Sequence, residues 1–169
     1  LCAQGNQEYI DKLLQNFSPS EILVQKKYKK DFTSAFGKDH HCFFLDDWIF
    51  KSDYAHETLN DHFGTKSLKG FGVDHLEEGI VASGAVLYYL GETRHHRLQH
   101  IVSLNRIAEE QYVWMDRFTI RNLELYHSNA ANAVTLLDVI DKTISPMGGR
   151  LLKRWLALPL KDANLIEQR

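Results

Sequence analysis

Residues 143–159 read Thr143-Ile-Ser-Pro-Met-Gly-Gly-Arg-Leu-Leu-Lys-Arg-Trp-Leu-Ala-Leu-Pro159, and this stretch specifies a helix together with both of its ends. Ser145 can accept hydrogen bonds from the first free amides, Pro146 suits the first helical position, and Pro159 ends the helix. The apolar side chains that recur at helical spacing on one face are Leu151, Leu152, Trp155 and Leu156. The sequence therefore predicts an amphipathic helix over residues 147–158, which packs its apolar face against a larger helical layer.

The composition is ordinary for one or two soluble globular domains. Of the 169 residues, 44% are hydrophobic and 25% are charged, which is adequate for a sizeable core. The formal net charge of −2 and the isoelectric point near 6.5 leave no broad cationic field. We therefore expect no tight nucleic-acid binding by this chain alone.

Cysteine usage and hydropathy indicate a cytoplasmic protein. Cys2 and Cys42 are too few for a disulfide framework and match no zinc spacing, which fits a reducing compartment. No apolar run approaches the roughly 20 residues that cross a bilayer, and no basic and apolar leader opens the sequence, so no membrane association is expected. The sequence does not begin with methionine, and we expect it to be a fragment of a longer protein.

The first half of the chain alternates short helices and short strands, as α/β proteins do. The expected elements are a helix over 6–15, a strand over 21–24, a helix over 28–36, a strand over 42–45, and helices over 54–62 and 76–90. The apolar run Cys42-Phe-Phe-Leu45 is typical of a parallel strand that is covered on both faces. In the last of these helices, the small residues 82–85 permit close approach to a sheet.

The second half of the chain is mainly helical and begins after a polar run, Gly91-Glu-Thr-Arg-His-His-Arg97. We place the boundary there, with one domain over 1–98 and the other over 99–169. Two segments at the start of the second domain are predicted to form a hairpin, 101–107 with 111–115. The helices expected after it cover 119–126, 135–140 and 147–158, and Asp162 caps another.

Acidic residues follow the second strand, a place where two-metal nucleases put their ligands. They are Asp46, Asp47, Asp53 and Glu57. Because adjacent residues on a strand point to opposite faces, Asp46 and Asp47 cannot bind one metal without a bend. We therefore interpret these residues as a polar loop that follows the strand, and not as a metal site.

Other polar clusters in the sequence also do not indicate a metal-binding or phosphate-binding site. His95, His96 and His100 have no nearby carboxylate or thiol to complete a metal site. The segment Lys69-Gly-Phe-Gly72 lacks the G-x-x-x-x-G-K-[ST] spacing of a phosphate-binding loop and is predicted to be a turn. The residues alone therefore predict no catalytic, cofactor or metal site in this chain.

Three motifs, in order along the chain, resemble the DNA mismatch-repair protein family MutS. They are Phe63-Gly-Thr-Lys-Ser-Leu-Lys-Gly-Phe-Gly-Val73, the run from Met115-Asp116 to Arg121-Asn122-Leu123-Glu124-Leu125, and the run from Leu136-Leu137-Asp138 to Ser145-Pro-Met-Gly-Gly-Arg-Leu-Leu-Lys-Arg-Trp155. The resemblance implies that residues 1–98 are part of the connector domain, with a ribonuclease-H-like α/β fold. Residues 99–169 would open the helical core, or lever, domain.

The resemblance also implies what the longer protein adds. The family's mismatch-reading domain with its Phe-x-Glu wedge and its ATPase with a phosphate-binding loop match nothing in this sequence. ATP, magnesium, mismatched DNA and a dimeric state are therefore expected of the full-length parent. The opening strands of the connector would precede Leu1, which would leave the sheet of the fragment incomplete.

A relay role and a docking role follow from the resemblance. The connector and core link DNA contact to nucleotide state, and the connector also contacts the downstream partner MutL through the helix before the Phe-Gly-Thr motif. The positions that match this contact are His56, Glu57 and Thr58, where Glu57-Thr58 departs from the glutamine-rich sequence of some relatives.

The core domain contributes a signature with a structural role. Its residues are Arg121, Asn122, Leu123, Glu124, Pro146, Met147, Gly148, Arg150 and Trp155. Arg121 and Glu124 are spaced for a side-chain pair on a helix. Gly148 and Gly149 each cost a helix roughly 1 kcal/mol relative to alanine, so we expect them to permit close contact with a neighbouring backbone.

Two alternatives stay open from the sequence. A MutS relative that acts in recombination would share the same motifs. A ribonuclease-H-like nuclease would need acidic side chains that converge on a metal ion.

Overall fold

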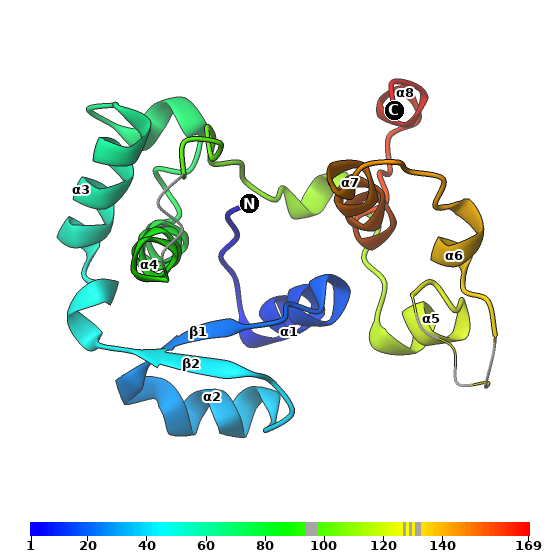
Figure 1. Cartoon of the computed structure of the whole chain (residues 1–169), viewed down its shortest axis with the longest axis horizontal. Helices are drawn as coiled ribbons and strands as arrows, with labels where there is room; N and C mark the ends of the chain where they lie inside the picture. The colour runs from blue at the N-terminus through cyan, green and yellow to red at the C-terminus, as the bar shows by residue number, and fades with distance from the viewer. Residues whose placement is uncertain (94–97, 127, 129, 131–132) are drawn as a thin grey trace. The chain divides into compact units, whose positions relative to one another are not determined.

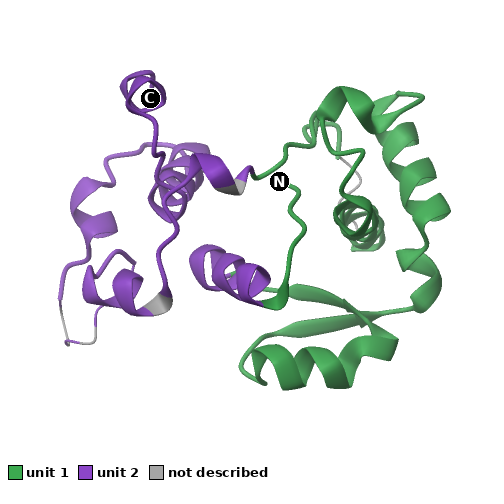
Figure 2. Ribbon diagram, turned by 180° about the vertical axis from the view of Figure 1, so that it is seen from behind, with its two compact units in different colours: residues 1–7, 19–107 green, residues 8–18, 108–169 purple. Residues whose placement is uncertain are grey.

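The computed structural model describes residues 1–93, 98–126, 128, 130 and 133–169. The chain forms two compact units (Figures 1 and 2). Unit 1 comprises Leu1–Gln7 and Pro19–Ile107, and unit 2 comprises Glu8–Ser18 and Ala108–Arg169. His95 and His96 lie outside the described residues.

Unit 1 is a mixture of helices with a small parallel sheet, as the sequence predicts. Its main elements are β1 (Ile22–Gln25), α2 (Lys29–Phe36), β2 (Cys42–Leu45), α3 (Ser52–Phe63) and α4 (Glu77–Glu92). Its short 3-10 helices are η1 (Lys26–Tyr28), η2 (Asp47–Phe50) and η3 (Leu68–Phe71). The strands β1 and β2 pair in parallel, with Ile22 beside Cys42 and Gln25 beside Leu45.

Helices cover β2 only partly. The helices α2 and α4 lie on opposite sides of the two strands (Figure 1). Lys29 Nζ of α2 lies 4.8 Å from the centre of the Phe44 ring, and the Phe43 ring packs 5.2 Å from that of Tyr89 of α4. Phe43 nevertheless stays 48% exposed, while Leu45 is buried. The expectation of full cover on both faces is therefore wrong for Phe43.

The core of unit 1 lies between α3 and α4. Its buried residues include Ala55 and Leu59 of α3, and Ile80 and Leu87 of α4. A Cβ atom added to Gly84 of α4 would lie 2.8 Å from both Cα and Cβ of Ala55, closer than real Cβ contacts allow. Gly84 thus permits close approach to the helix α3, whereas Ala85 packs in a buried cluster with Leu45 of β2, so the predicted approach to the sheet holds for Ala85 only.

The predicted hairpin between 101–107 and 111–115 is wrong, because each segment pairs with a distant part of the chain. Cys2 donates from its amide to the Asn105 carbonyl at 2.7 Å, and Ile107 donates back to the Cys2 carbonyl at 2.8 Å. Val113 donates to the Pro159 carbonyl at 2.8 Å. These bonds use the backbone groups that a hairpin would need.

Unit 2 consists of helices joined by loops. They are α1 (Gln7–Phe17, all but its first residue in unit 2), η4 (Glu109–Gln111), α5 (Arg117–Asn122), α6 (Leu136–Ile140), α7 (Pro146–Ala157) and α8 (Ala163–Glu167). The side chains that cap α5, α6, α7 and α8 belong to Asp116, Thr135, Ser145 and Asp162. The caps predicted at Ser145 and Asp162 are confirmed, because these local signals use only neighbouring residues.

The helix α1 packs within unit 2. The ring of Tyr9 meets that of Trp114 edge-on, with the ring centres 5.1 Å apart. Asn16 is 6% exposed and donates to the Ala157 carbonyl at 3.4 Å. A helix from the start of the chain therefore contributes to the helical unit at its end. The domain boundary that the sequence predicts at residue 98 concerns sequence domains and not these compact units, and it stays a prediction.

Candidate docking surface

The helix α3 has a well-defined start and end. Asp53 lies in its first turn, where a negative charge favours the helix dipole. Gly64 ends the helix in the left-handed conformation, with φ of 63°, and donates from its amide to the carbonyls of Asn60 and Asp61. This positive φ explains why a glycine stands in the Phe-Gly-Thr motif.

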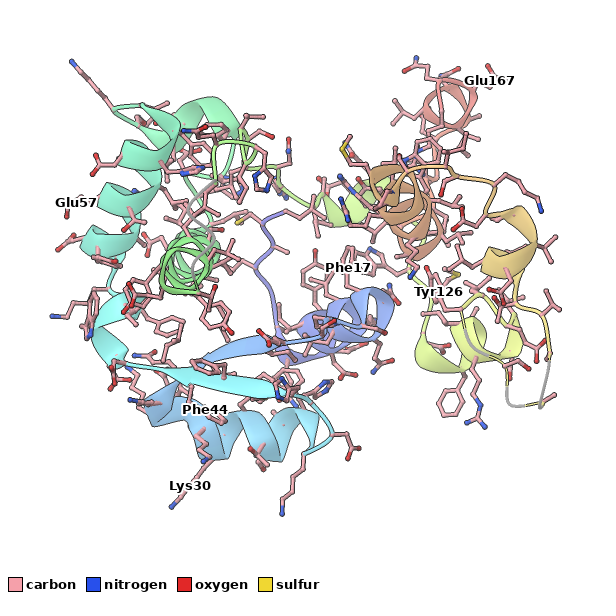
Figure 3. All side chains as sticks on the ribbon, viewed as in Figure 1. Phe17, Lys30, Phe44, Glu57, Tyr126 and Glu167 are labelled. Atoms are coloured by element: carbon pink, nitrogen blue, oxygen red, sulfur yellow. The ribbon has the colours of Figure 1, made fainter. Side chains whose placement is uncertain are left out.

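One face of α3 is buried and the other is available to solvent. Ala55 and Leu59 point into the core of unit 1. His56 and Thr58 are half-buried and Glu57 is exposed. Figure 3 shows the Glu57 side chain directed away from α4. Of the three residues that the family resemblance marks, Glu57 therefore points away from the core, and the half-buried His56 and Thr58 flank it.

The first two acidic residues after β2 contact lysine residues that follow β1. Asp46 makes an ion pair with Lys26 Nζ at 2.5 Å, and a carboxylate oxygen of Asp47 accepts from the Lys27 amide at 3.4 Å. Among the residues that the structure describes, no group of three or more histidine, cysteine, aspartate or glutamate side chains is arranged to hold a metal ion.

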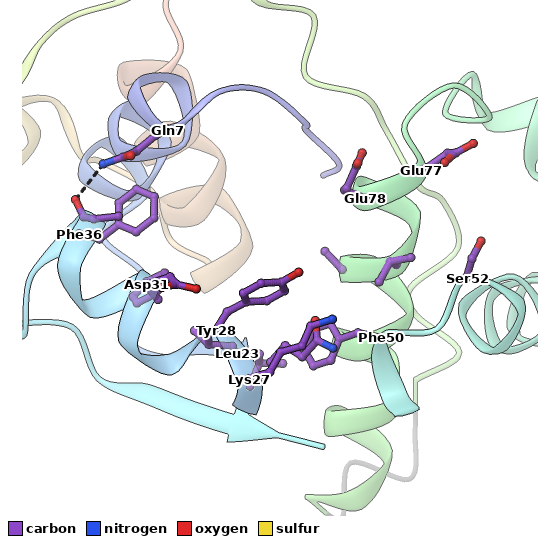
Figure 4. Close-up of a pocket in the computed structure, with 16 residues that line it drawn as sticks. Gln7, Leu23, Lys27, Tyr28, Asp31, Phe36, Phe50, Ser52, Glu77 and Glu78 are labelled. Atoms are coloured by element: carbon purple, nitrogen blue, oxygen red, sulfur yellow. Dashed lines mark hydrogen bonds between the residues drawn. The ribbon is translucent and has the colours of Figure 1, made fainter. Parts of the chain in front are cut away.

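An open cavity lies in unit 1 between α2, β1 and α4 (Figure 4). Its volume is about 710 Å³, and Leu23, Phe32 and Val81 are among the apolar residues that line it. The polar side chains at its margin include Tyr28 and Asp31. The lining therefore combines apolar and polar side chains.

The end of α5 and the residues directly after it contact α6 through the backbone. Arg121, Asn122, Leu123 and Glu124 are exposed, whereas Leu125 is buried. The carbonyls of Glu124 and Leu125 accept from the first amides of α6 at 3.0 and 3.1 Å. Glu124 has a positive φ of 47°, and its carboxylate accepts from the Ser128 hydroxyl at 2.6 Å. The expected pair of Arg121 with Glu124 is absent from the described ion pairs, because Glu124 lies beyond the end of the helix.

The signature residues of α7 occupy its first turns and its centre. Pro146 stands at the helix start, Met147 is 75% exposed and Arg150 is exposed. Trp155 is half-buried, and the Arg169 guanidinium lies 5.2 Å from the centre of its ring.

The glycines at the start of α7 make room for a side chain. A Cβ atom on Gly148 would lie 3.1 Å from Thr143 Cβ, and one on Gly149 would lie 3.3 Å from Thr143 Oγ1. The close neighbour is therefore the Thr143 side chain and not another backbone, which corrects the expectation from the sequence. The reason is that the chain before Ser145 turns back over the first turn of α7.

Aromatic side chains from three elements of unit 1 gather in a way that the sequence analysis did not anticipate. Trp48 of η2, Tyr54 of α3 and Tyr88 of α4 contact one another edge to face, and we call these three residues the aromatic patch. Trp48 and Tyr54 are close in the sequence but lie on different elements, and Tyr88 is distant from both. Helix or strand periodicity in the sequence therefore cannot predict that these three rings meet.

Two family models match this chain. MutS domain II matches residues 2–102, which is more than half of the chain, and MutS domain III matches residues 118–169. The chain belongs to the MutS family. The first match coincides with the α/β part of the chain and the second with α5 to α8.

Curated MutS proteins are similar to the chain over its whole length. The protein named DNA mismatch repair protein MutS from Christiangramia forsetii is 86% identical over 169 residues, which cover 100% of this chain and 19% of that protein. Proteins of the same name from Flavobacterium johnsoniae and Parabacteroides distasonis are 72% and 54% identical, over 20% and 19% of their lengths. The chain therefore spans about a fifth of the length of these MutS relatives.

Two further properties of this MutS-family chain are its lack of a described membrane-spanning helix and the state of its two cysteines. Within the described residues, no helix combines the length and the apolar character that a membrane crossing requires. Cys2 is buried and Cys42 is half-buried, and both are free thiols. Burial raises the pKa of the Cys2 thiol, so that it stays protonated near neutral pH and behaves as a small apolar side chain.

Tyr126 joins the end of α5 to α7 in unit 2 (Figure 3). Its hydroxyl donates to the Lys153 carbonyl at 3.4 Å, and burial raises the pKa of Tyr126 to about 12. The folded state therefore holds the phenolic proton at pH values where the unfolded chain releases it.

We expect unit 2 to lose stability as the pH rises from 10 to 12. Because the folded pKa is the higher one, the stabilisation is complete below pH 10 and is lost as the pH approaches 12. Partial exposure limits it to about 1 kcal/mol. Urea unfolding below pH 10 and near pH 12 checks this, with Tyr126→Phe as the variant that lacks the proton. An equal loss of stability in both proteins would contradict the prediction.

Proposed function

We propose that the chain is the relay portion of a MutS mismatch-repair protein, which couples DNA contact to nucleotide state in the longer parent. The observation that carries the proposal is the similarity, over the whole chain, to relatives that are named DNA mismatch repair proteins. Coupling between distant sites needs rigid elements that can change their arrangement as bodies. Two separately packed units provide such elements.

The parent protein supplies the chemistry in this proposal. ATP and magnesium bind outside this chain, mismatched DNA is the target of the parent, and the parent works as a dimer. Residues 1–98 belong to a connector with a ribonuclease-H-like fold, and residues 99–169 open the core. The names of the relatives favour repair over recombination as the task of the parent.

A hybrid protein tests the relay proposal. The 169 residues replace their counterpart in MutS from Christiangramia forsetii, to which they are 86% identical. We expect the hybrid to restore a normal mutation rate in cells without MutS and to keep mismatch-stimulated ATP hydrolysis. A hybrid that accumulates normally and hydrolyses ATP, but no longer responds to a mismatch and leaves the mutation rate high, would refute the relay role. A normal mutation rate with altered crossover frequency would instead support the recombination alternative.

We also propose that the exposed side of α3, with His56, Glu57 and Thr58, docks MutL. The support is local: the exposed Glu57, flanked by the half-buried His56 and Thr58, lies on a helix whose opposite face is packed in the core by Ala55 and Leu59. A rigid helix that presents polar side chains suits a polar interface of moderate size.

Replacement of Glu57 and Thr58 by tryptophan in the hybrid is expected to weaken MutL binding by on the order of tenfold. Bulky rings on the accessible side would block close approach of the partner without entering the core. The matched control is Lys30→Trp with Ser34→Trp on the exposed side of α2, which should leave MutL binding unchanged. Retention of MutL on immobilised protein measures both. Undiminished retention by the α3 variant, with an unchanged melting temperature, would remove the docking proposal.

A further inference from the structure

The aromatic patch is an ordered cluster at the surface of unit 1. The ring centre of Trp48 lies 5.1 Å from that of Tyr54 and 5.3 Å from that of Tyr88, and the two tyrosine rings are 6.2 Å apart. The interplanar angles are 74°, 80° and 72°, so all three pairs meet edge to face. This geometry is favourable between aromatic rings and holds each ring in place.

The patch rests on the core but remains accessible. Tyr54 and Tyr88 pack against a buried cluster that includes Leu45, Ile49 and Ala85. Trp48, in contrast, is 45% exposed. Rigid, partly exposed aromatic side chains lose little conformational entropy on binding and are the side chains that dominate protein interfaces.

Several carboxylates neighbour the patch, in the sequence or through their charge. Asp47 directly precedes Trp48, and Asp53 directly precedes Tyr54. Burial is the main reason why the pKa of the Tyr88 hydroxyl is raised, and the charges of Glu92 and Asp46 add to the effect. Asp46 is paired with Lys26, so that one of these acids is already partly neutralised.

We propose that the aromatic patch is a docking surface for a protein segment that carries arginine or lysine side chains next to aliphatic ones. A guanidinium or ammonium group lies favourably over the face of an aromatic ring, most of all over tryptophan. The neighbouring carboxylates can accept its hydrogen bonds, and aliphatic side chains cover the rest of the rings. The surrounding negative charge disfavours nucleic-acid phosphates at the same place. This inference goes beyond the docking of MutL on α3 and does not depend on it.

The test follows the indole N–H signals of the 169-residue chain by NMR during titration with a short peptide of alternating leucine and arginine. The chain has three tryptophans, Trp48, Trp114 and Trp155, and Trp48→Phe assigns the signal of the patch. We expect the Trp48 signal to shift progressively, while the Trp114 signal stays in place. The same peptide with citrulline in place of arginine should bind on the order of tenfold more weakly, since it keeps the shape but loses the charge.

Variants distinguish binding of the peptide at the aromatic patch from nonspecific binding to any exposed aromatic residue. Trp48→Ala should abolish binding of the arginine peptide, and Asp47→Asn with Glu92→Gln should weaken it without touching any ring. The matched control is Phe118→Ala, because Phe118 is a 73% exposed aromatic residue of unit 2. It should bind the peptide as the unchanged chain does.

Four results would overturn the proposal. Equal binding of the citrulline peptide would show that charge plays no part, and undiminished binding by the variant of Asp47 and Glu92 would show the same. A Trp48 shift that depends on protein concentration without peptide would show that a second copy covers the patch. A larger Trp48 shift with a short DNA duplex would assign the surface to nucleic acid.

Discussion

We expect Ile80→Ala to lower the free energy of unfolding of unit 1 by about 2 to 5 kcal/mol, the largest effect of a single change considered for this chain. Ile80 is 1% exposed and belongs to the cluster that joins α3 and α4. Removal of its side chain beyond Cβ loses apolar burial and leaves a cavity that the tightly packed helices cannot fill. Urea unfolding monitored by circular dichroism measures the loss.

Val86→Ala is the matched control for Ile80→Ala. Val86 is a β-branched residue of the same helix, but it is 45% exposed. Its replacement should change stability little, because alanine has the higher helix propensity and little burial is lost. If the two variants lost the same free energy, the core of unit 1 would not lie between α3 and α4 as described.

The second large effect is expected at Gly84, where Gly84→Ala should destabilise unit 1 by about 1 to 3 kcal/mol. The added methyl group would lie 2.8 Å from Cα and Cβ of Ala55, so the two helices must move apart. The matched control is Gly91→Ala in the same helix, where nothing lies within 4 Å of the new Cβ. There we expect stabilisation of up to about 1 kcal/mol, from helix propensity alone.

A double variant tests whether Ala55 is the cause. Ala55→Gly removes one of the two Ala55 atoms that lie 2.8 Å from the new methyl group, so Gly84→Ala should cost less in that background than in the unchanged chain. Thermal unfolding of the four proteins gives the coupling between the two positions. Independent, additive effects would mean that the contact between Gly84 and Ala55 does not limit the approach of α3 and α4.

Local signals in the sequence predicted the ends of the helices well. Ser145 and Pro146 start α7 and Asp162 starts α8, as expected. Each of these signals depends on hydrogen bonds within one turn, or on the φ angle of one residue. The uninterrupted apolar run Cys42-Phe-Phe-Leu45 also predicted a parallel strand, and β2 does pair in parallel, although the run did not indicate β1 as its partner.

Pairings between distant segments were beyond the reach of such signals. The segments 101–107 and 111–115 have the composition of a hairpin, but their backbone partners are Cys2 and Pro159. Likewise, the apolar face of α1 gives no indication that Tyr9 packs on Trp114. Periodicity shows that a face is apolar and cannot show what covers it.

The candidate site also has one part that the sequence indicated and one part that only the structure shows. The family motif after α3 directed attention to His56, Glu57 and Thr58, and the structure adds that they lie on an accessible helix surface. The aromatic patch depends on contacts among η2, α3 and α4 and became visible only in three dimensions. Its members are common residue types without a characteristic spacing.

The path of the chain has a practical consequence for dissection of the gene. Because unit 2 takes residues 8–18 from between the two parts of unit 1, a gene fragment for 108–169 alone would omit α1 and uncover the ring of Trp114. Conversely, 19–107 is an insertion between two parts of one helical body. Excision of this insertion, with a short glycine linker from Ser18 to Ala108, would retain every segment of unit 2 in a miniature protein.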